Sequence, residues 1–221
     1  MASELFVDNI TGKTGTSGGA PITLSGDTAT LGTGVTVPAS IGGSKHLIQK
    51  QTASSVALLE FTSLGNHSAF TLLEFVFSEI MPATDDVQFR ARIATSGTSY
   101  QTSNYHFLNF YYERNTSSGT TGHNVSDNTS TEWCGFGGTG NNTTNDGGIN
   151  GTMTVYNHNS SSVYKSGLSF VNTSTHNDWW IGKIGHSTYR ANKNAFAAIK
   201  FEMSSGNISS GSITMYGVKD A

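Results

Sequence analysis

The segment Val87-Gln88-Phe89-Arg90-Ala91-Arg92-Ile93 alternates apolar and polar side chains without a break. Successive side chains of a β-strand point to opposite faces of a sheet, so this period of two is typical of a strand with one buried face and one solvent face. The preceding residues 81–86 contain a proline and two adjacent aspartates, which favour a turn. The sequence therefore predicts a half-buried strand at 87–93 that follows a tight turn.

Strand-like patterns continue on both sides of this segment. We expect further strands at residues 46–51, 55–61, 70–77, 105–112, 153–156, 166–171, 179–184, 195–203 and 212–218. In 70–77 and 105–112 apolar side chains occupy both faces, which indicates that both faces are at least partly covered. No stretch has the apolar period of an amphipathic helix of three turns. The predicted fold class is all-β, an antiparallel β-sandwich of jelly-roll-like type.

Two regions depart from this core-forming pattern. Residues 1–45 are expected to form an extended N-terminal attachment arm, because residues 14–19 carry no apolar side chain to bury and only residues 33–37 favour a short edge strand. Residues 46–221 are expected to form the sandwich body. Within the body, residues 115–151 are dominated by Gly, Asn, Thr and Ser, which predicts a long loop region.

The composition supports a folded, weakly charged body. Charged residues make up 12% of the chain, against about 25% in typical domains. Hydrophobic residues make up 35%, including 12 Phe and 8 Tyr, which is enough apolar area for a sizeable core. The formal net charge is −3 and the Lys and Arg residues do not cluster. We therefore expect no nucleic-acid partner, which would require concentrated positive charge.

The single cysteine, Cys134, cannot form an internal disulfide, and we expect it to be a small buried hydrophobic residue. No apolar run approaches the roughly 18 residues that a membrane span requires. The N-terminus lacks a basic segment followed by an apolar signal core. No membrane partner and no export through a signal peptide are expected.

Three passages carry a resemblance to a known class of proteins. They are LFVDNITGKTG at residues 5–15, FVFSEIMPATDDVQFR at residues 75–90 and GNISSGSITMYGVK at residues 206–219. They resemble virion structural proteins of tailed bacteriophages, particularly marine ones, of the capsid decoration, cement or fibre type. The resemblance implies assembly in the host cytoplasm and a place on the virion surface. Together with the closed cyclic symmetry that suits threefold positions of icosahedral shells, it also implies a homotrimer.

The apolar residues of the arm are Leu5, Phe6, Val7 and Ile10. We expect them to bind the major capsid protein or neighbouring virion subunits through strand pairing and apolar contact. The entropy cost of ordering such a segment is offset only where its binding site exists. Attachment would therefore depend on virion assembly.

A hydrolase that acts on host polysaccharide is the sharpest enzymatic alternative, and it would need two carboxylates facing each other across a sugar. The candidates, Glu74, Glu79, Asp85, Asp86, Glu113, Glu132 and Asp178, lie on turns or strands without a defined partner. Cys134 and the serines lack a nucleophile motif, the seven histidines lack zinc-site spacing, and the glycine-rich residues 135–140 lack a phosphate-binding continuation. We expect no enzymatic activity, no cofactor and no metal site.

Four aromatic residues, Trp133, Trp179, Trp180 and Tyr189, have two interpretations. Paired tryptophans at the start of a strand are typical of a core or a subunit interface. An exposed aromatic ring can instead stack on the apolar side of a pyranose, which would make these residues a contact surface for a host glycan.

The function predicted from the sequence is that of a non-enzymatic capsid decoration or cement protein, which binds and stabilises the head shell through its N-terminal arm. The alternative is a tail or head fibre that recognises a host surface glycan. The sequence contains no coiled-coil heptads and no β-helix repeats from which a long fibre stalk could be built. This absence favours the compact decoration protein.

Overall fold

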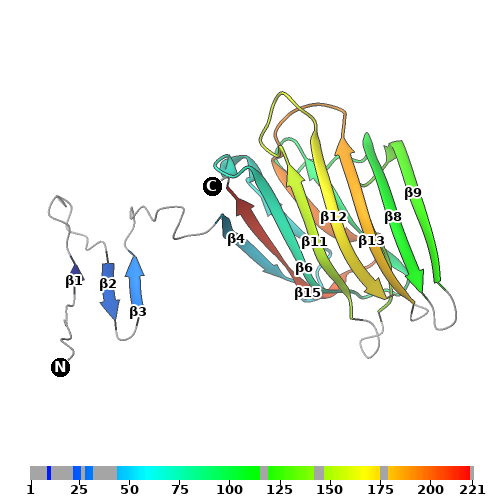
Figure 1. The fold of residues 1–221 in the computed structure, drawn as a ribbon, viewed down its shortest axis with the longest axis horizontal. Helices are drawn as coiled ribbons and strands as arrows, with labels where there is room; N and C mark the ends of the chain where they lie inside the picture. The colour runs from blue at the N-terminus through cyan, green and yellow to red at the C-terminus, as the bar shows by residue number, and fades with distance from the viewer. Residues whose placement is uncertain are drawn as a thin grey trace. The chain divides into compact units, whose positions relative to one another are not determined.

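The computed structural model describes residues 44–114, 119–141, 147–174 and 179–219, together with three short strands nearer the N-terminus (Figure 1). The chain divides into two compact units, Met1–Gly43 and Ser44–Ala221. This division lies next to the boundary that the sequence predicts after residue 45.

The N-terminal unit contains a small antiparallel sheet of β1 (Asn9–Ile10), β2 (Ile22–Ser25) and β3 (Thr28–Leu31), in that order. Ile22 of β2 pairs with Ile10 of β1 and with Leu31 of β3. Of the predicted attachment residues, Ile10 is therefore placed in a strand. Leu5, Phe6 and Val7 lie outside the described residues, as does the edge strand predicted at 33–37.

The second unit consists of two antiparallel sheets, which confirms the predicted all-β sandwich. The larger sheet has eight strands, seen side by side in Figure 1 in the order β4 (Lys45–Thr52), β15 (Ile208–Val218), β6 (Leu72–Pro82), β11 (Ile149–Tyr156), β12 (Lys165–Ser174), β13 (Trp180–Tyr189), β8 (Tyr105–Arg114) and β9 (Gly119–Ser130). The smaller sheet has the order β10 (Cys134–Thr139), β7 (Val87–Ala94), β14 (Ala198–Met203) and β5 (Leu58–Thr62). A single 3-10 turn, η1 (Leu64–His67), follows β5.

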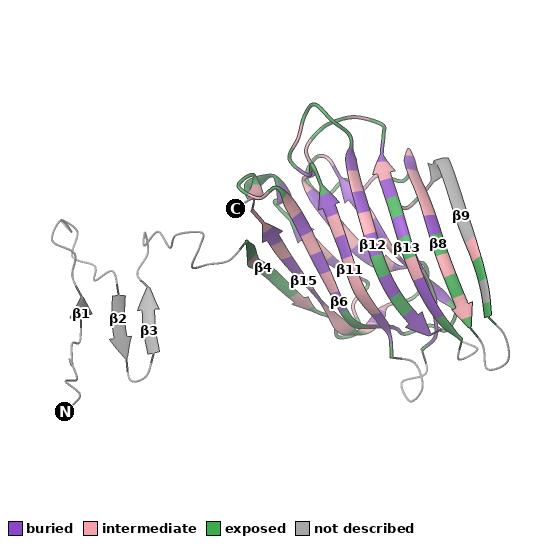
Figure 2. Ribbon diagram, in the orientation of Figure 1, coloured by how far each residue is buried: buried purple, intermediate pink, exposed green. Residues whose placement is uncertain are grey.

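Phenylalanine side chains fill the space between the two sheets. Phe77 of β6 lies with its ring centroid 5.6 Å from that of Phe89, 5.1 Å from that of Phe136 and 5.3 Å from that of Phe201. All four side chains are at most 2% exposed. The alternation at 87–93 is confirmed, because its apolar positions are buried and its polar positions are half-buried or exposed. Figure 2 shows a similar alternation of buried and more exposed positions along strands of the larger sheet.

The glycine-rich stretch 115–151, predicted as a loop region, contains the strands β9 and β10 and the start of β11. β9 pairs with β8 along one edge of the larger sheet, and β10 pairs with β7 along one edge of the smaller sheet. Both segments lack the apolar period of a strand, and each is held by backbone pairing to a neighbour that has that period. The tertiary context therefore overrides the local composition here.

β6 also extends further than predicted, through the expected turn residues Met81 and Pro82. A bulge at Glu79, whose φ is 53°, interrupts its pairing with both neighbours. A Cβ atom on Gly211 would lie 2.4 Å from the carbonyl oxygen of Glu79, so only glycine fits beside this bulge.

Candidate functional site

Three neighbouring strands of the larger sheet, β12, β13 and β8, depart in part from the usual distribution of side chains. A sheet with one face on a core normally places its apolar residues on that face and polar residues on the other. The inward positions here include Asn109, Ser169 and Ser187, which are at most 3% exposed. The outward positions include Phe110, Phe170 and Ile184, which are 55%, 49% and 47% exposed. Large apolar side chains therefore face away from the core.

The strand register brings these outward residues together. Ile184 of β13 pairs with Phe170 of β12 on one side and with Phe110 of β8 on the other. Directly paired residues have Cβ atoms about 5 Å apart, so the three side chains form one continuous row across the strands. We call this row, with Tyr112 and Trp180 on the same surface, the aromatic face.

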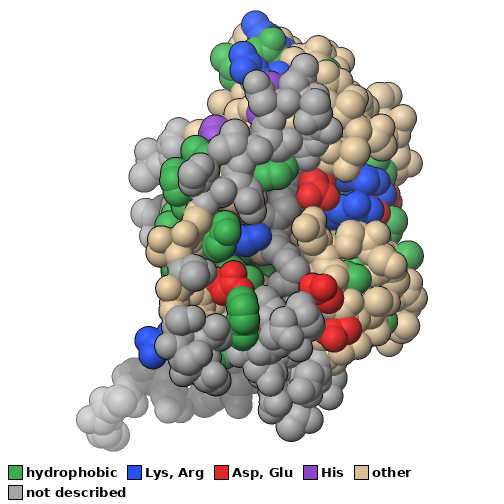
Figure 3. All heavy atoms as spheres, turned by 90° about the vertical axis from the view of Figure 1, so that its right-hand side faces the viewer, with side chains coloured by type: hydrophobic (Ala, Val, Ile, Leu, Met, Phe, Trp, Pro, Cys, Tyr) green, Lys and Arg blue, Asp and Glu red, His purple; other side chains and the backbone are tan. Residues whose placement is uncertain are grey.

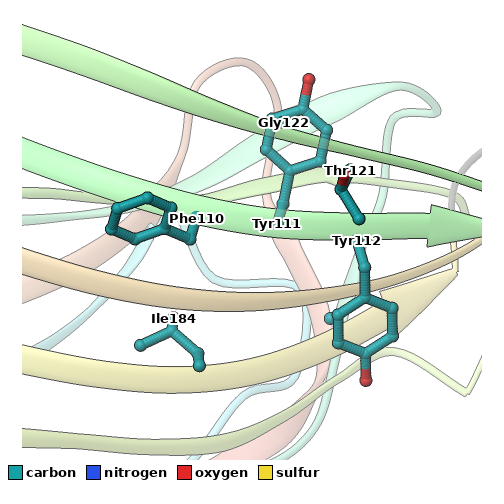
Figure 4. A pocket seen from close by; sticks show the side chains of 7 residues that line it. Phe110, Tyr111, Tyr112, Thr121, Gly122 and Ile184 are labelled. Atoms are coloured by element: carbon teal, nitrogen blue, oxygen red, sulfur yellow. The ribbon is translucent and has the colours of Figure 1, made fainter.

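Tyr112 extends the aromatic face by one row, and its position depends on a glycine. Tyr112 pairs with Gly182 of β13, and a Cβ atom built on Gly182 would lie 2.3–2.4 Å from the outer atoms of the Tyr112 ring. The ring therefore lies directly over Gly182, which is buried beneath it, while Tyr112 itself is 63% exposed. Figure 4 shows the rings of Tyr111 and Tyr112 leaning away from β8 in opposite directions.

Two open hollows lie on either side of the Tyr112 ring. The first has a volume of about 410 Å³ and is lined by Phe110, Tyr112, Ile184, Thr121 and the glycines beside them (Figure 4). The second has a volume of about 280 Å³, and its lining includes Tyr112, Trp180, Asn150 and Asn172. Tyr112 and Gly182 belong to both hollows, so the two are adjacent.

Of the polar side chains at the second hollow, that of Asn150 is hydrogen-bonded to other described residues and that of Asn172 is not. Asn150 is engaged within the chain, because its Oδ1 accepts a hydrogen bond from the Glu79 N–H at 2.9 Å and its Nδ2 donates one to the Gly147 carbonyl at 2.9 Å. Asn172 pairs with Gly182 in the register and is exposed. Its amide forms no hydrogen bond with the described residues and is available to a ligand.

The four aromatic residues singled out from the sequence separate into two pairs. Trp133 is fully buried, with its ring centroid 5.2 Å from that of Phe196. Tyr189 is 1% exposed and packs against Tyr105 at 5.4 Å. Both therefore belong to the core, which is one of the two interpretations left open by the sequence, and neither forms a contact surface for a glycan.

The other pair, Trp179 and Trp180, is exposed, at 36% and 67%. Trp180 lines the second hollow and pairs with Arg114 of β8. The sequence interpretation did not select Phe110, Tyr112, Phe170 or Ile184, because it treated both faces of residues 105–112 as covered. The available signal was the polar residues opposite them, such as Asn109 and Ser169, at positions that a core would normally fill with apolar side chains.

A separate cluster of charged residues covers the outside of the smaller sheet. Glu202 of β14 accepts ion pairs from Arg90 and Arg92 at 3.2 Å and from Lys200 at 2.7 Å. Figure 3, seen from the β9 edge, shows such Lys and Arg side chains beside Asp and Glu side chains on one flank of the molecule. The ion pairs with Arg90 and Arg92 join β14 to the neighbouring strand β7.

Glu132 borders this charged cluster, with its Oε2 3.8 Å from Nη1 of Arg90. Burial raises the pKa of Glu132, and the nearby Arg90 and Arg92 oppose that shift. Another candidate, Glu74, forms an ion pair with Lys45 at 2.8 Å, and Asp178 lies outside the described residues. The Glu74 ion pair thus joins β6 to β4 across the intervening strand β15.

Among the described residues, no group of three or more His, Cys, Asp or Glu side chains is arranged to hold a metal ion. In the same part of the chain, no helix is long and apolar enough to cross a membrane. Comparisons with protein-family models, with curated proteins and with solved structures found no match to this chain.

Proposed function

We propose that this chain is a non-enzymatic virion surface protein whose sandwich body binds a host surface glycan on the aromatic face. The observation that carries the proposal is the aromatic face on β8, β12 and β13, where large Phe, Tyr, Trp and Ile side chains are exposed on a sheet surface turned away from the core. Exposed apolar surface of this kind on a protein marks a place of interaction.

The chemistry of the aromatic face fits a sugar better than an apolar protein surface. A pyranose has an apolar side that stacks on aromatic rings and hydroxyl groups around its rim that need hydrogen-bond partners. Tyr112 and Trp180 supply exposed rings, and Asn172 and Thr121 supply amide and hydroxyl groups at the same hollows. Ligand sites usually combine an apolar lining with a few well-placed polar groups in this manner.

The assignment to a virion comes from the three passages that resemble phage structural proteins. The division into two units supports it, because a separate N-terminal unit suits attachment to the particle while the body faces the host. In this proposal residues 1–43 bind the capsid or neighbouring virion subunits, and the body recognises the cell surface.

The test is binding of the full chain to an array of bacterial surface glycans. Tyr112→Ala and Trp180→Ala each remove one exposed ring and should weaken binding. Tyr156→Ala is the matched control, because Tyr156 is 37% exposed on β11 of the same sheet, away from both hollows. Equal binding by all three variants, or no binding by the unmodified chain, would contradict the proposal.

Capsid decoration, the function predicted first from the sequence, is the second candidate. The observation that favours it is the separate N-terminal unit, in which β1, β2 and β3 pair only with one another among the described strands. Co-sedimentation of the full chain with undecorated capsids tests it. Removal of residues 1–43 leaves the entire core in place and should abolish co-sedimentation. Saturation at a symmetry-related copy number would support a decoration protein. Without such saturation, the N-terminal unit would attach to another part of the virion.

A further inference from the structure

We infer that the aromatic face takes an uncharged glycan segment of at least two adjacent sugar units, with one unit on each side of the Tyr112 ring. This inference rests on the proposed function, since it specifies the class of glycan that the face accepts. It follows from the arrangement of the two hollows, the position of the shared ring and the absence of charged side chains from the described lining.

The length follows from the path of the hollows across the sheet. The first hollow extends from Tyr112 towards Ile184 and towards Thr121 of β9. The second extends from Tyr112 towards Trp180 and towards Asn172 of β12. Ile184 and Trp180 are four positions apart on β13, which corresponds to about 13 Å along the strand. A single pyranose is about the size of one aromatic ring, so one sugar unit cannot occupy both hollows.

Tyr112 is a preformed platform at the centre of this path. The ring lies over Gly182, in space that the Cβ atom of any other residue would occupy. A ring held in place before binding loses little conformational entropy when a ligand stacks on it. Because the ring borders both hollows, it can contact two consecutive sugar units.

Each hollow also offers polar groups suited to sugar hydroxyls. Thr121, which pairs with Tyr112, supplies a hydroxyl at the first hollow. The Asn172 amide, which has both a donor and an acceptor, stands beside Trp180 at the second. Each half of the path thus combines an apolar surface with hydrogen-bonding groups.

The described lining disfavours a charged sugar. Among the described residues, no Asp, Glu, Lys or Arg lines either hollow. A carboxylate or sulfate bound there would lose hydration without gaining an ion pair, which is unfavourable. Arg114 pairs with Trp180 at the margin of the second hollow, but it is exposed, and an exposed ion pair contributes about 1 kcal/mol or less.

Isothermal titration of the full chain tests the inference with neutral hexose mono-, di- and trisaccharides and with their uronic-acid counterparts. Neutral disaccharides should bind about tenfold more tightly than the monosaccharide, because the second unit gains a stacking partner. Trp180→Ala should remove this gain and leave monosaccharide binding unchanged, whereas Tyr112→Ala should weaken both. Tyr156→Ala should change neither.

The outcomes separate this inference from the proposed function. Equal affinity for mono- and disaccharides, or preference for the uronic-acid ligands, would overturn the inference while glycan binding stands. Self-association of the chain that Trp180→Ala abolishes, without binding of any sugar, would overturn both and identify the aromatic face as a contact between copies.

Discussion

Replacement of Gly182 by alanine tests whether the position of one aromatic ring controls ligand binding. The new Cβ atom would lie 2.3–2.4 Å from the Cζ, Cε1 and hydroxyl oxygen atoms of Tyr112. Two non-bonded heavy atoms cannot approach this closely, so the Tyr112 ring must leave its place over β13. These atoms are at the far end of the side chain, and Tyr112 is already 63% exposed, so the ring can rotate into solvent.

The cost in stability is small. A fully buried tyrosine removes about 200 Å² from water. Tyr112 buries roughly a third of that area, which corresponds to at most about 2 kcal/mol. The added methyl group restricts the unfolded chain, which stabilises the folded state by about 0.4–1 kcal/mol, since Gly182 has no positive φ. We expect the free energy of unfolding to fall by about 1 kcal/mol.

The expected loss of binding free energy is larger than the expected loss of stability. Loss of one stacked ring removes both its buried area and its specific contact with the sugar, together about 2 kcal/mol, or roughly a thirtyfold loss of affinity. Urea denaturation and isothermal titration with a neutral disaccharide measure the two quantities on the same protein. The matched control is Gly217→Ala, whose Cβ atom would meet the Phe70 ring at 2.3 Å, away from both hollows.

The control should lose stability without loss of affinity. Unchanged affinity in Gly182→Ala would refute the role of the fixed ring. A fall in stability above about 3 kcal/mol, typical of a disrupted core, would refute the argument that the displaced ring reaches solvent without disturbing the core.

Three further predictions concern the stability of the body, each measured by urea denaturation. Trp133→Ala should lower the free energy of unfolding by about 3–5 kcal/mol, because this ring is fully buried. Trp180→Ala should change the free energy of unfolding by less than about 0.5 kcal/mol, because its ring is largely exposed. Similar values for both variants would contradict the assignment of Trp133 to the core. Ser187→Ala should stabilise the fold by about 1 kcal/mol, because the buried Ser187 hydroxyl has no hydrogen-bond partner among the described residues; a loss of stability would reveal one. Burial lowers the pKa of His158, so the unfolded chain binds a proton more readily than the folded chain does. The free energy of unfolding should therefore decrease as the pH falls below about 6.5. His158→Gln should flatten this decrease, and an unchanged slope would assign it to another group.

The sequence predicted the fold class well because the strands that form the core have strong local patterns. The alternation at 87–93 places Phe89 between the sheets, and the patterns at 70–77 and 195–203 do the same for Phe77 and Phe201. Periodicity reports which face of a strand is apolar, and in these strands the apolar face is the buried one.

The aromatic face could not be predicted in the same manner. Phe110, Phe170 and Ile184 come from three segments, and only the register of β12, β13 and β8 shows that they are neighbours. In β8 the alternate positions are apolar on both faces, so local pattern does not distinguish a covered face from an exposed one. The strands β9 and β10 were also missed, because pairing with β8 and β7 compensates for their glycine-rich composition.

The inward side chains of these strands are small for a structural reason. A Cβ atom on Gly167 would lie 3.2 Å from the Trp133 ring and 3.0 Å from the Ser187 hydroxyl oxygen. Likewise, a Cβ atom on Gly185 would lie 2.7 Å from the hydroxyl oxygen of Ser169. Small residues on β12 and β13 therefore leave the space that Trp133 fills between the sheets.

The outward side chains have no such reason within the described chain. Phe110, Phe170 and Ile184 each leave about half of their surface in water, which forgoes about 1 kcal/mol apiece relative to full burial. The same cross-strand row continues with Thr152 of β11, Val76 of β6 and Thr214 of β15, β-branched residues that suit a strand face. The row thus changes from small β-branched to large, exposed residues at Phe170 of β12. Packing of the core explains what these strands place inside, and the proposed glycan binding accounts for what they place outside.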